Sequence, residues 1–178
     1  MICLCPICAC VVLYPEIPGM DPPSLEAVKL NPDAPWTVTC NWLGPLHEGR
    51  AVLIDRLFRT DGASIPRFAW PLIGHPFQVP LLPYALEHDA LYVARYLSRK
   101  ATDRRFYASM TGDGYISRCK AGTIYNAVHL FGGSAFNRHT EESIGEARKH
   151  IRLIGEEEYF SIVRHNTEQP EPPKGKHK

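Results

Sequence analysis

The chain has almost no net charge, because 20 lysine and arginine residues nearly balance 19 aspartate and glutamate residues, leaving +1 over 178 residues. Without a positive excess it has no field that would attract nucleic-acid phosphates, so we expect no nucleic-acid partner. The sequence also lacks an apolar run of about 18 residues, the length that a membrane-spanning helix needs. No internal repeat is visible. These absences favour one globular domain, and a hydrophobic content of 44% is ordinary for that class.

Cysteine is scarce except at the start, where four of the six cysteines lie: Cys3, Cys5, Cys8 and Cys10. Their spacing could supply four thiolates to zinc, but structural zinc sites commonly use two ligand pairs separated by a longer loop, and no second pair follows. We weigh two interpretations equally, disulfides to another chain and reduced cysteines on an apolar arm. A metal site ranks third. Residues 2–13 resemble the core of a signal peptide, but no Lys or Arg precedes them, so we assign no export signal.

The 16 prolines divide the chain unevenly, because they lie mostly in the first 83 residues and the last ten. Proline interrupts regular structure, so this distribution predicts an irregular first half and a helical second half. We expect residues 1–33 to form an extended arm rich in cysteine and proline. Residues 34–165 are expected to form a single globular domain. Residues 166–178, rich in proline and lysine, form a tail of the disordered type that cannot bury enough surface to fold alone.

A β-hairpin is expected at the start of the domain. Residues 36–42 are rich in β-branched and aromatic side chains, which predicts a strand. Residues 44–49 contain two glycines and a proline, which predicts a turn, and residues 51–55 begin the return strand. We expect this second strand to continue through Phe58 and to end at residues 61–62.

The second half carries apolar residues at helical spacing. This period predicts helices over residues 83–97, 99–111 and 117–130, with Ser98 as the N-cap of the second. A fourth, amphipathic helix is expected from Thr140 to Arg164, interrupted near residue 155. The expected fold class is therefore α+β, with a small N-terminal β-hairpin packed on a bundle of three or four helices.

Side chains suited to catalysis concentrate on two of the expected helices. His88 and Asp89 are adjacent, so their side chains diverge by about 100° and can serve different partners. Tyr92 lies one turn after His88, and Asp103 lies near the start of the next helix. If these helices pack antiparallel, Asp103 can accept a hydrogen bond from one His88 ring nitrogen and leave the other free to act as a base. Asp89 is an oxygen ligand suited to calcium, which would polarise a carbonyl group.

The run of His88, Asp89 and Tyr92, followed by Asp103 and Phe106, resembles the core of phospholipase A2, especially its bacterial and fungal branch. The resemblance implies that His88 is the base, Asp89 a calcium ligand, and Tyr92 and Asp103 the supporting network. Phospholipases of this type flank the His-Asp pair with cysteines in disulfides, and no cysteine stands near it here. Their calcium loop is also rich in glycine. The only candidate loop here, residues 60–63, has one glycine and offers Asp61 as a second metal ligand.

The full pattern, TDGASIP, then HDALY, then D-x-x-F-x-x-x-M, is similar to a phage- and prophage-borne family known as domain of unknown function 1353. This likeness covers about residues 58–132. It implies a virion protein made in the bacterial host cytoplasm. The arm and the tail would then contact other virion proteins, and the His88 site would act on a phospholipid membrane.

Two functions from different classes follow from these residues. The first is a metal-assisted ester hydrolase that acts on phospholipid in a phage virion. The second is a non-catalytic virion or assembly protein in which the His88–Asp103 helix pair only packs. A peptidoglycan hydrolase ranks third, because no zinc-type cluster can be assembled around His88.

Each candidate residue also has a structural interpretation. Asp103 could only favour the N-terminal dipole of its helix, Asp61 could belong to a turn, and Tyr92 could belong to the core. Five further histidines have no partner at a useful spacing in the sequence: His75, His129, His139, His150 and His165.

Overall fold

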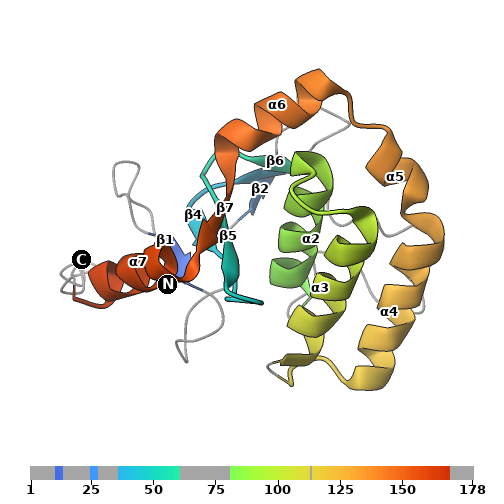
Figure 1. Cartoon of the computed structure of the whole chain (residues 1–178), viewed down its shortest axis with the longest axis horizontal. Helices are drawn as coiled ribbons and strands as arrows, with labels where there is room; N and C mark the ends of the chain where they lie inside the picture. The colour runs from blue at the N-terminus through green and yellow to red at the C-terminus, as the bar shows by residue number, and fades with distance from the viewer. Residues whose placement is uncertain (1–10, 14–24, 28–35, 61–80, 113, 169–178) are drawn as a thin grey trace, which may run out of the picture.

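The computed structural model describes residues 11–13, 25–27, 36–60, 81–112 and 114–168. These residues form two small β-sheets and a group of helices, with the sheets on one side and most of the helices on the other (Figure 1). None of the described helices combines the length and the apolar character needed to cross a membrane. The cysteines at positions 3, 5, 8 and 10, Asp61 and residues 169–178 of the expected tail lie outside the described residues. Residues 166–168, which we expected to begin that tail, are helical instead.

The larger sheet has four strands in the order β1 (Val11–Leu13), β4 (Asn41–Leu43), β5 (Arg50–Ile54) and β7 (Ile151–Gly155). Strand β1 is parallel to β4, and the other neighbours are antiparallel. Strands β4 and β5 form a hairpin whose turn contains Glu48 and Gly49, both at positive φ, and closes with a bridge between His47 and Arg50. Strand β7 pairs with β5 along all five residues, so the C-terminal half of the chain completes this sheet.

The smaller sheet has three strands in the order β2 (Leu25–Ala27), β3 (Trp36–Val38) and β6 (Arg59–Thr60). Both of its strand pairs are antiparallel. Strands β1 and β2 therefore place short parts of the N-terminal region in both sheets. The segment that links β5 to β6 turns at Leu57, where φ is +77°.

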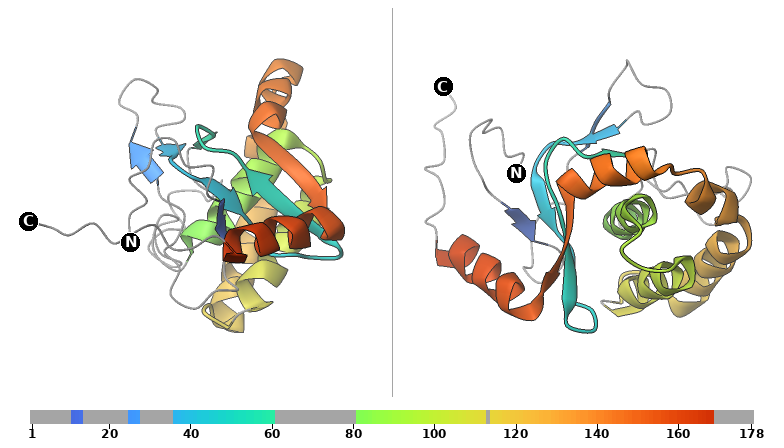
Figure 2. Two further views of the ribbon diagram at one scale, coloured as in Figure 1. Left: turned by 90° about the vertical axis from the view of Figure 1, so that its left-hand side faces the viewer. Right: turned by 45° about the horizontal axis from the view of Figure 1, so that its top comes forward.

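Six helices are described: α2 (Leu82–Ala94), α3 (Arg99–Gly112), α4 (Arg118–Phe131), α5 (Gly133–Asn137), α6 (Glu141–His150) and α7 (Glu156–Glu168). Local capping explains where three of them begin. The side chains of Ser98, Ser117 and Thr140 each accept a hydrogen bond from a main-chain N–H three residues later. Helices α6, α5 and α4 curve around the α2–α3 pair, while α7 lies beyond the sheet (Figures 1 and 2).

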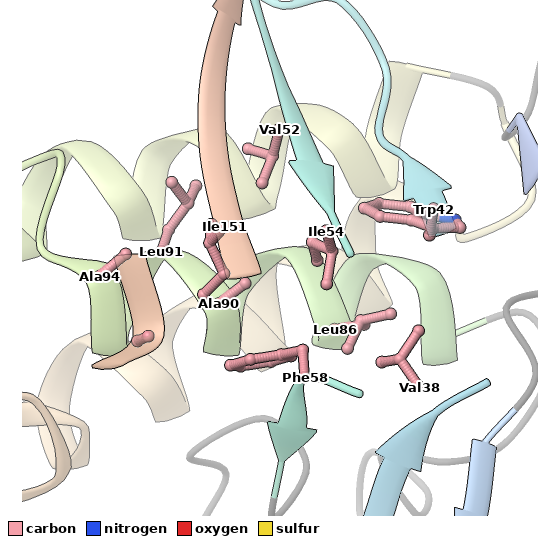
Figure 3. Packing of buried hydrophobic residues seen from close by; sticks show 11 residues of the cluster. Val38, Trp42, Val52, Ile54, Phe58, Leu86, Ala90, Leu91, Ala94 and Ile151 are labelled. Atoms are coloured by element: carbon pink, nitrogen blue, oxygen red, sulfur yellow. The ribbon is translucent and has the colours of Figure 1, made fainter. Parts of the chain in front are cut away.

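Helix α2 is the centre of the molecule, because every residue of it except Val93 is buried. One face packs against the larger sheet, where Val52, Ile54 and Ile151 meet Leu86 and Ala90 (Figure 3). The opposite side packs against α3 and α4 through a second cluster that includes Phe106, Met110, Ile124 and Val128. Fully burying one large apolar side chain contributes about 1.5–3 kcal/mol, so these two clusters fix α2 from both sides.

The α+β class, the β4–β5 hairpin and the three helices α2, α3 and α4 confirm the expectations from the sequence, with helix ends within three residues of those expected. Two expectations were wrong in detail. The strand expected over residues 36–42 is interrupted at Thr39 and Cys40, so that β3 and β4 belong to different sheets. The return strand ends at Ile54 rather than continuing through Phe58, and β6 is separate.

The single fourth helix expected from Thr140 to Arg164 is the larger correction, because it contains α6, the strand β7 and α7. The buried residues Ile144, Ala147, Ile151 and Ile154 recur at three- or four-residue intervals, which is the period of a helix. Residues 151–155 are nevertheless extended, because they complete the hydrogen bonds of an otherwise exposed edge of β5.

Candidate active site around His88

Helix α2 carries three consecutive buried ionisable residues, Glu87, His88 and Asp89, each with an exposed fraction of 1–2%. Successive helical side chains diverge by about 100°, so each of the three meets a different partner. Buried ionisable groups need such partners, because an unpaired charge in the interior is costly. The partners of Glu87, His88 and Asp89 therefore decide which of these side chains could take part in chemistry and which only hold the fold.

His88 faces α3, where its Nε2 atom lies 3.2 Å from Oδ1 of Asp103. Tyr92, one turn along α2, donates its hydroxyl hydrogen to the same oxygen at 2.5 Å. The His88 ring also packs against two aromatic rings, with centroid distances of 4.1 Å to Tyr92 and 4.5 Å to Phe106. Arg95 ends α2 in the left-handed region at φ +50°, and the short link to α3 lets the two helices lie side by side. The three residues that we expected to meet, His88, Tyr92 and Asp103, are thus in contact in the structure.

The second oxygen of Asp103 has partners that the sequence did not reveal. Its Oδ2 atom lies 3.2 Å from Nδ1 of His129 on α4 and 3.6 Å from a guanidinium nitrogen of Arg99. His129 thus has a partner in space, although the sequence places none at a useful spacing from it. No sequence signal marks this contact, because Asp103 and His129 are 26 residues apart and on different helices.

The charges at this site follow from burial and these hydrogen bonds. Burial lowers the pKa of His88 below its usual range, although Asp103 and Glu87 oppose the shift. Burial alone would raise the pKa of Asp103, but hydrogen bonds from His88, Tyr92 and His129 outweigh burial and lower it. Burial and the nearby Asp103 charge raise the pKa of Tyr92. At neutral pH the site therefore holds a neutral imidazole, a carboxylate and a neutral phenol.

The tautomer of His88 follows from this arrangement. A neutral ring that donates to Asp103 carries its hydrogen on Nε2, which leaves a lone pair on Nδ1. Nδ1 is shielded from solvent and has no hydrogen-bond partner within the part of the chain that the structure describes. An oriented imidazole with one unpaired nitrogen has the arrangement of a general base.

Asp89 points away from this network, toward strand β6. The hydroxyl of Thr60, at the end of β6, donates a hydrogen bond to Oδ2 of Asp89, and both residues are buried. Among the described residues, no group of three His, Cys, Asp or Glu side chains is placed to hold a metal ion. Asp61, the second expected calcium ligand, directly follows Thr60 but lies outside the described residues.

Glu87 forms a buried ion pair that the sequence also did not reveal. The Nε and Nη2 atoms of Arg105 on α3 both lie 2.7 Å from Oε1 of Glu87, and Ser109 donates to Oε2 at 3.2 Å. The same guanidinium donates to main-chain carbonyls of the β4–β5 turn, at distances of 3.0–3.3 Å: Pro45, His47 and Arg50. Arg105 therefore ties the hairpin to the two helices that carry the His88 site.

Comparison with protein families gives one match, over residues 36–128, to the family described as "Protein of unknown function (DUF1353)". The chain belongs to this family. The DUF1353 segment runs from β3 to α4 and includes His88, Tyr92 and Asp103, while His129 lies one residue beyond it. Strand β7, which completes the larger sheet, also lies beyond the matched segment.

Two curated relatives are similar to part of this chain, and both come from Sinorhizobium fredii. "Uncharacterized protein y4jT" is 36% identical over 74 residues, which is 42% of this chain and 22% of the relative. "Uncharacterized protein y4iH" is 29% identical over 102 residues, which is 57% of this chain and 42% of the relative. The chain thus spans less than half the length of either relative. No solved structure matches it.

Proposed function

We propose that this protein is a hydrolase that cleaves ester bonds of phospholipids, with His88 as the general base. The observation that carries the proposal is the state of the His88 ring. Its Nε2 atom is held 3.2 Å from Asp103, while Nδ1 has no hydrogen-bond partner among the described residues. The likeness of this residue pattern to phospholipase A2 supports the choice of substrate class.

In the proposed reaction, a water molecule beside Nδ1 of His88 attacks the ester carbonyl carbon and gives one proton to Nδ1. The resulting imidazolium is stabilised by the Asp103 carboxylate, which already lies against Nε2. When the tetrahedral intermediate collapses, the carbon–oxygen bond to the leaving alcohol breaks. Nδ1 then returns the proton to that alcohol, so the ring ends the cycle neutral.

Calcium bound by Asp89 and Asp61 remains part of the proposal, because carboxylates are the oxygen ligands that calcium prefers. When bound, calcium would polarise the ester carbonyl. The described residues do not provide a complete calcium site, because only Asp89 is among them and its Oδ2 is already bound by Thr60. The proposed reaction therefore has no step through calcium, and the chelator arm of the vesicle experiment tests the metal.

The biological setting that we propose is a phage virion, with the protein made in the bacterial host cytoplasm. The support is the likeness of the TDGASIP, HDALY and D-x-x-F pattern to phage- and prophage-borne proteins. The N-terminal arm, with its four cysteines, and the proline- and lysine-rich tail would contact other virion proteins.

A non-catalytic virion protein is the second candidate, and one observation favours it. His88 has an exposed fraction of only 1%, and its Nδ1 is shielded from solvent. A histidine that packs on Tyr92 and Phe106 and binds Asp103 could serve only to join α2 to α3. The two candidates differ in whether Nδ1 of His88 takes part in chemistry.

The deciding experiment measures fatty-acid release from mixed phospholipid vesicles, with added calcium and with a chelator. His88→Gln is the informative variant, because the glutamine amide can still donate to Asp103 in place of Nε2 but offers no base in place of Nδ1. His165→Gln, on the exposed face of α7, is the matched control. We expect release by the wild type and the control, and a loss of about 10²–10⁴-fold in His88→Gln.

The outcomes separate the alternatives. No release by the folded wild-type protein, or full release by His88→Gln, would refute the hydrolase and favour the structural protein. Release that persists in chelator would remove calcium from the proposal and keep the base. A virion extract in which an antibody detects no copy of the protein would refute the proposed location.

A further inference from the structure

Asp103 is held at both of its oxygens, and the proposed function uses only one of them. Oδ1 contacts His88 and Tyr92, both on α2. Oδ2 contacts His129 on α4 and Arg99 on α3. The Asp103 side chain is completely buried, so these four groups take the place of the water that would otherwise solvate its charge.

His129 is itself held in place from two directions. Its ring stacks on that of Tyr125, one turn earlier on α4, with a centroid distance of 5.5 Å and an angle of 10° between the planes. Its main-chain carbonyl accepts a hydrogen bond of 2.8 Å from Arg99. The ring therefore presents Nδ1 to Asp103 in one defined orientation. The exposed fraction of the His129 side chain is 37%, whereas the His88 side chain is fully buried.

A carboxylate bound at one oxygen only can still rotate about the bond between Cβ and Cγ. Fixing the second oxygen sets the plane of the carboxylate and so the direction from which Oδ1 meets the His88 ring. Among the described donors to Oδ2, His129 is the closer at 3.2 Å, while Arg99 lies at 3.6 Å. His129 is thus the main anchor of that oxygen.

We propose that His129 is a positioning residue of the His88 site, which holds Oδ2 of Asp103 so that Oδ1 keeps His88 in the tautomer with hydrogen on Nε2. This inference rests on the proposed function for its catalytic consequence, because a ring in the other tautomer would have no lone pair on Nδ1. It adds helix α4 to a site that would otherwise lie on α2 and α3 alone.

Packing alone does not explain this contact. Helices α3 and α4 are already joined by a buried cluster that includes Phe106, Met110, Ile124 and Val128. One half-exposed hydrogen bond is not needed to hold the two helices together. A purely structural role for His129 would therefore leave the state of the His88 ring unchanged when His129 is replaced.

Two substitutions of His129 distinguish a positioning role from a purely structural one. In His129→Asn, the amide nitrogen of asparagine can occupy the place of Nδ1 and donate to Asp103. In His129→Ala, the donor is lost. His165→Ala, on the exposed face of α7, controls for removal of an imidazole elsewhere. All variants are made in the full chain.

The first readout is independent of activity. Nitrogen NMR of the ¹⁵N-labelled imidazoles reports which nitrogen of His88 carries the hydrogen. We expect the Nε2–H tautomer in the wild type, in His129→Asn and in the control, and a shift toward a mixture of tautomers in His129→Ala. Identical His88 signals in the wild type and His129→Ala would overturn the inference.

The second readout is vesicle hydrolysis at neutral pH. We expect kcat to fall about 10-fold in His129→Ala with KM unchanged, and to be restored in His129→Asn. An unchanged kcat in His129→Ala would also overturn the inference. If the wild type hydrolyses no phospholipid, the proposed function fails while the NMR comparison still decides whether His129 positions His88.

Discussion

The buried ion pair between Glu87 and Arg105 gives the sharpest test of how this fold is held together. Substituting Glu87→Gln keeps the size of the side chain and an oxygen that can accept from Arg105, but it removes the negative charge. The pair is almost completely shielded, with exposed fractions of 5% for the Arg105 side chain and 3% for that of Glu87. The positive charge of Arg105 would therefore remain in the interior without a counter-charge.

The expected cost follows from the surroundings of Arg105. Removing one partner of a buried ion pair typically costs about 3–5 kcal/mol, because the remaining charge is neither paired nor hydrated. Here three main-chain carbonyls of the β4–β5 turn still accept hydrogen bonds from Arg105 at 3.0–3.3 Å, and the new amide oxygen can accept another. We therefore expect the lower end, about 3 kcal/mol. Because domains are stable by only about 5–15 kcal/mol, this is a large part of the total.

Urea unfolding followed by circular dichroism measures this effect. With a slope of about 2 kcal/mol per molar urea, the unfolding midpoint of Glu87→Gln should fall by about 1.5 M. The decrease should persist in high salt, because a buried pair is little screened. Glu146→Gln is the control, since it breaks the exposed pair with Lys149 and should leave the midpoint unchanged. A decrease of less than about 0.5 M in Glu87→Gln would refute the reasoning.

Two further predictions concern the His88 site. Gly132→Ala should destabilise the protein by about 1–3 kcal/mol, because the new methyl group would lie 2.6 Å from the main-chain oxygen of Val128 and 2.8 Å from the Tyr92 hydroxyl that binds Asp103. Urea unfolding beside Gly112→Ala, where the methyl group meets no described atom within 4 Å, tests this, and equal midpoints would contradict it. Acid should weaken the fold in two stages. Burial lowers the pKa of His88, so the unfolded chain binds a proton that the folded chain does not, and stability should fall as the pH drops below about 6.5. The pKa of Asp103 is also lowered, so the stability that this carboxylate provides is present above its ordinary pKa of 3.8 and is lost as the pH falls further. Urea midpoints measured from about pH 8 to about pH 2 test both stages, and an unchanged first stage in His88→Gln would show that another group causes it.

The sequence alone determined the elements whose signals are local. Helices α2, α3 and α4 follow from apolar residues that keep a helical period, and Ser98 marks the start of α3 as an N-cap. The same local spacing predicted that His88, Tyr92 and Asp103 come together, since a short link joins α2 to α3 and turns the second helix back on the first. A hydrogen-bonded cap or a one-turn spacing involves only residues close in the chain, so composition and order suffice to predict it.

Only the tertiary structure decided the contacts between distant segments. Strand β7 has apolar residues at helical intervals, and it is extended because β5 offers it a complete set of hydrogen bonds about 100 residues earlier in the chain. His129 reaches Asp103 from 26 residues away, Arg105 reaches the β4–β5 turn from as far as 60 residues away, and neither contact has a spacing that a sequence pattern could mark. These side chains meet because whole helices and strands pack around α2. That packing exists only in the folded chain, so a local sequence pattern does not reveal it.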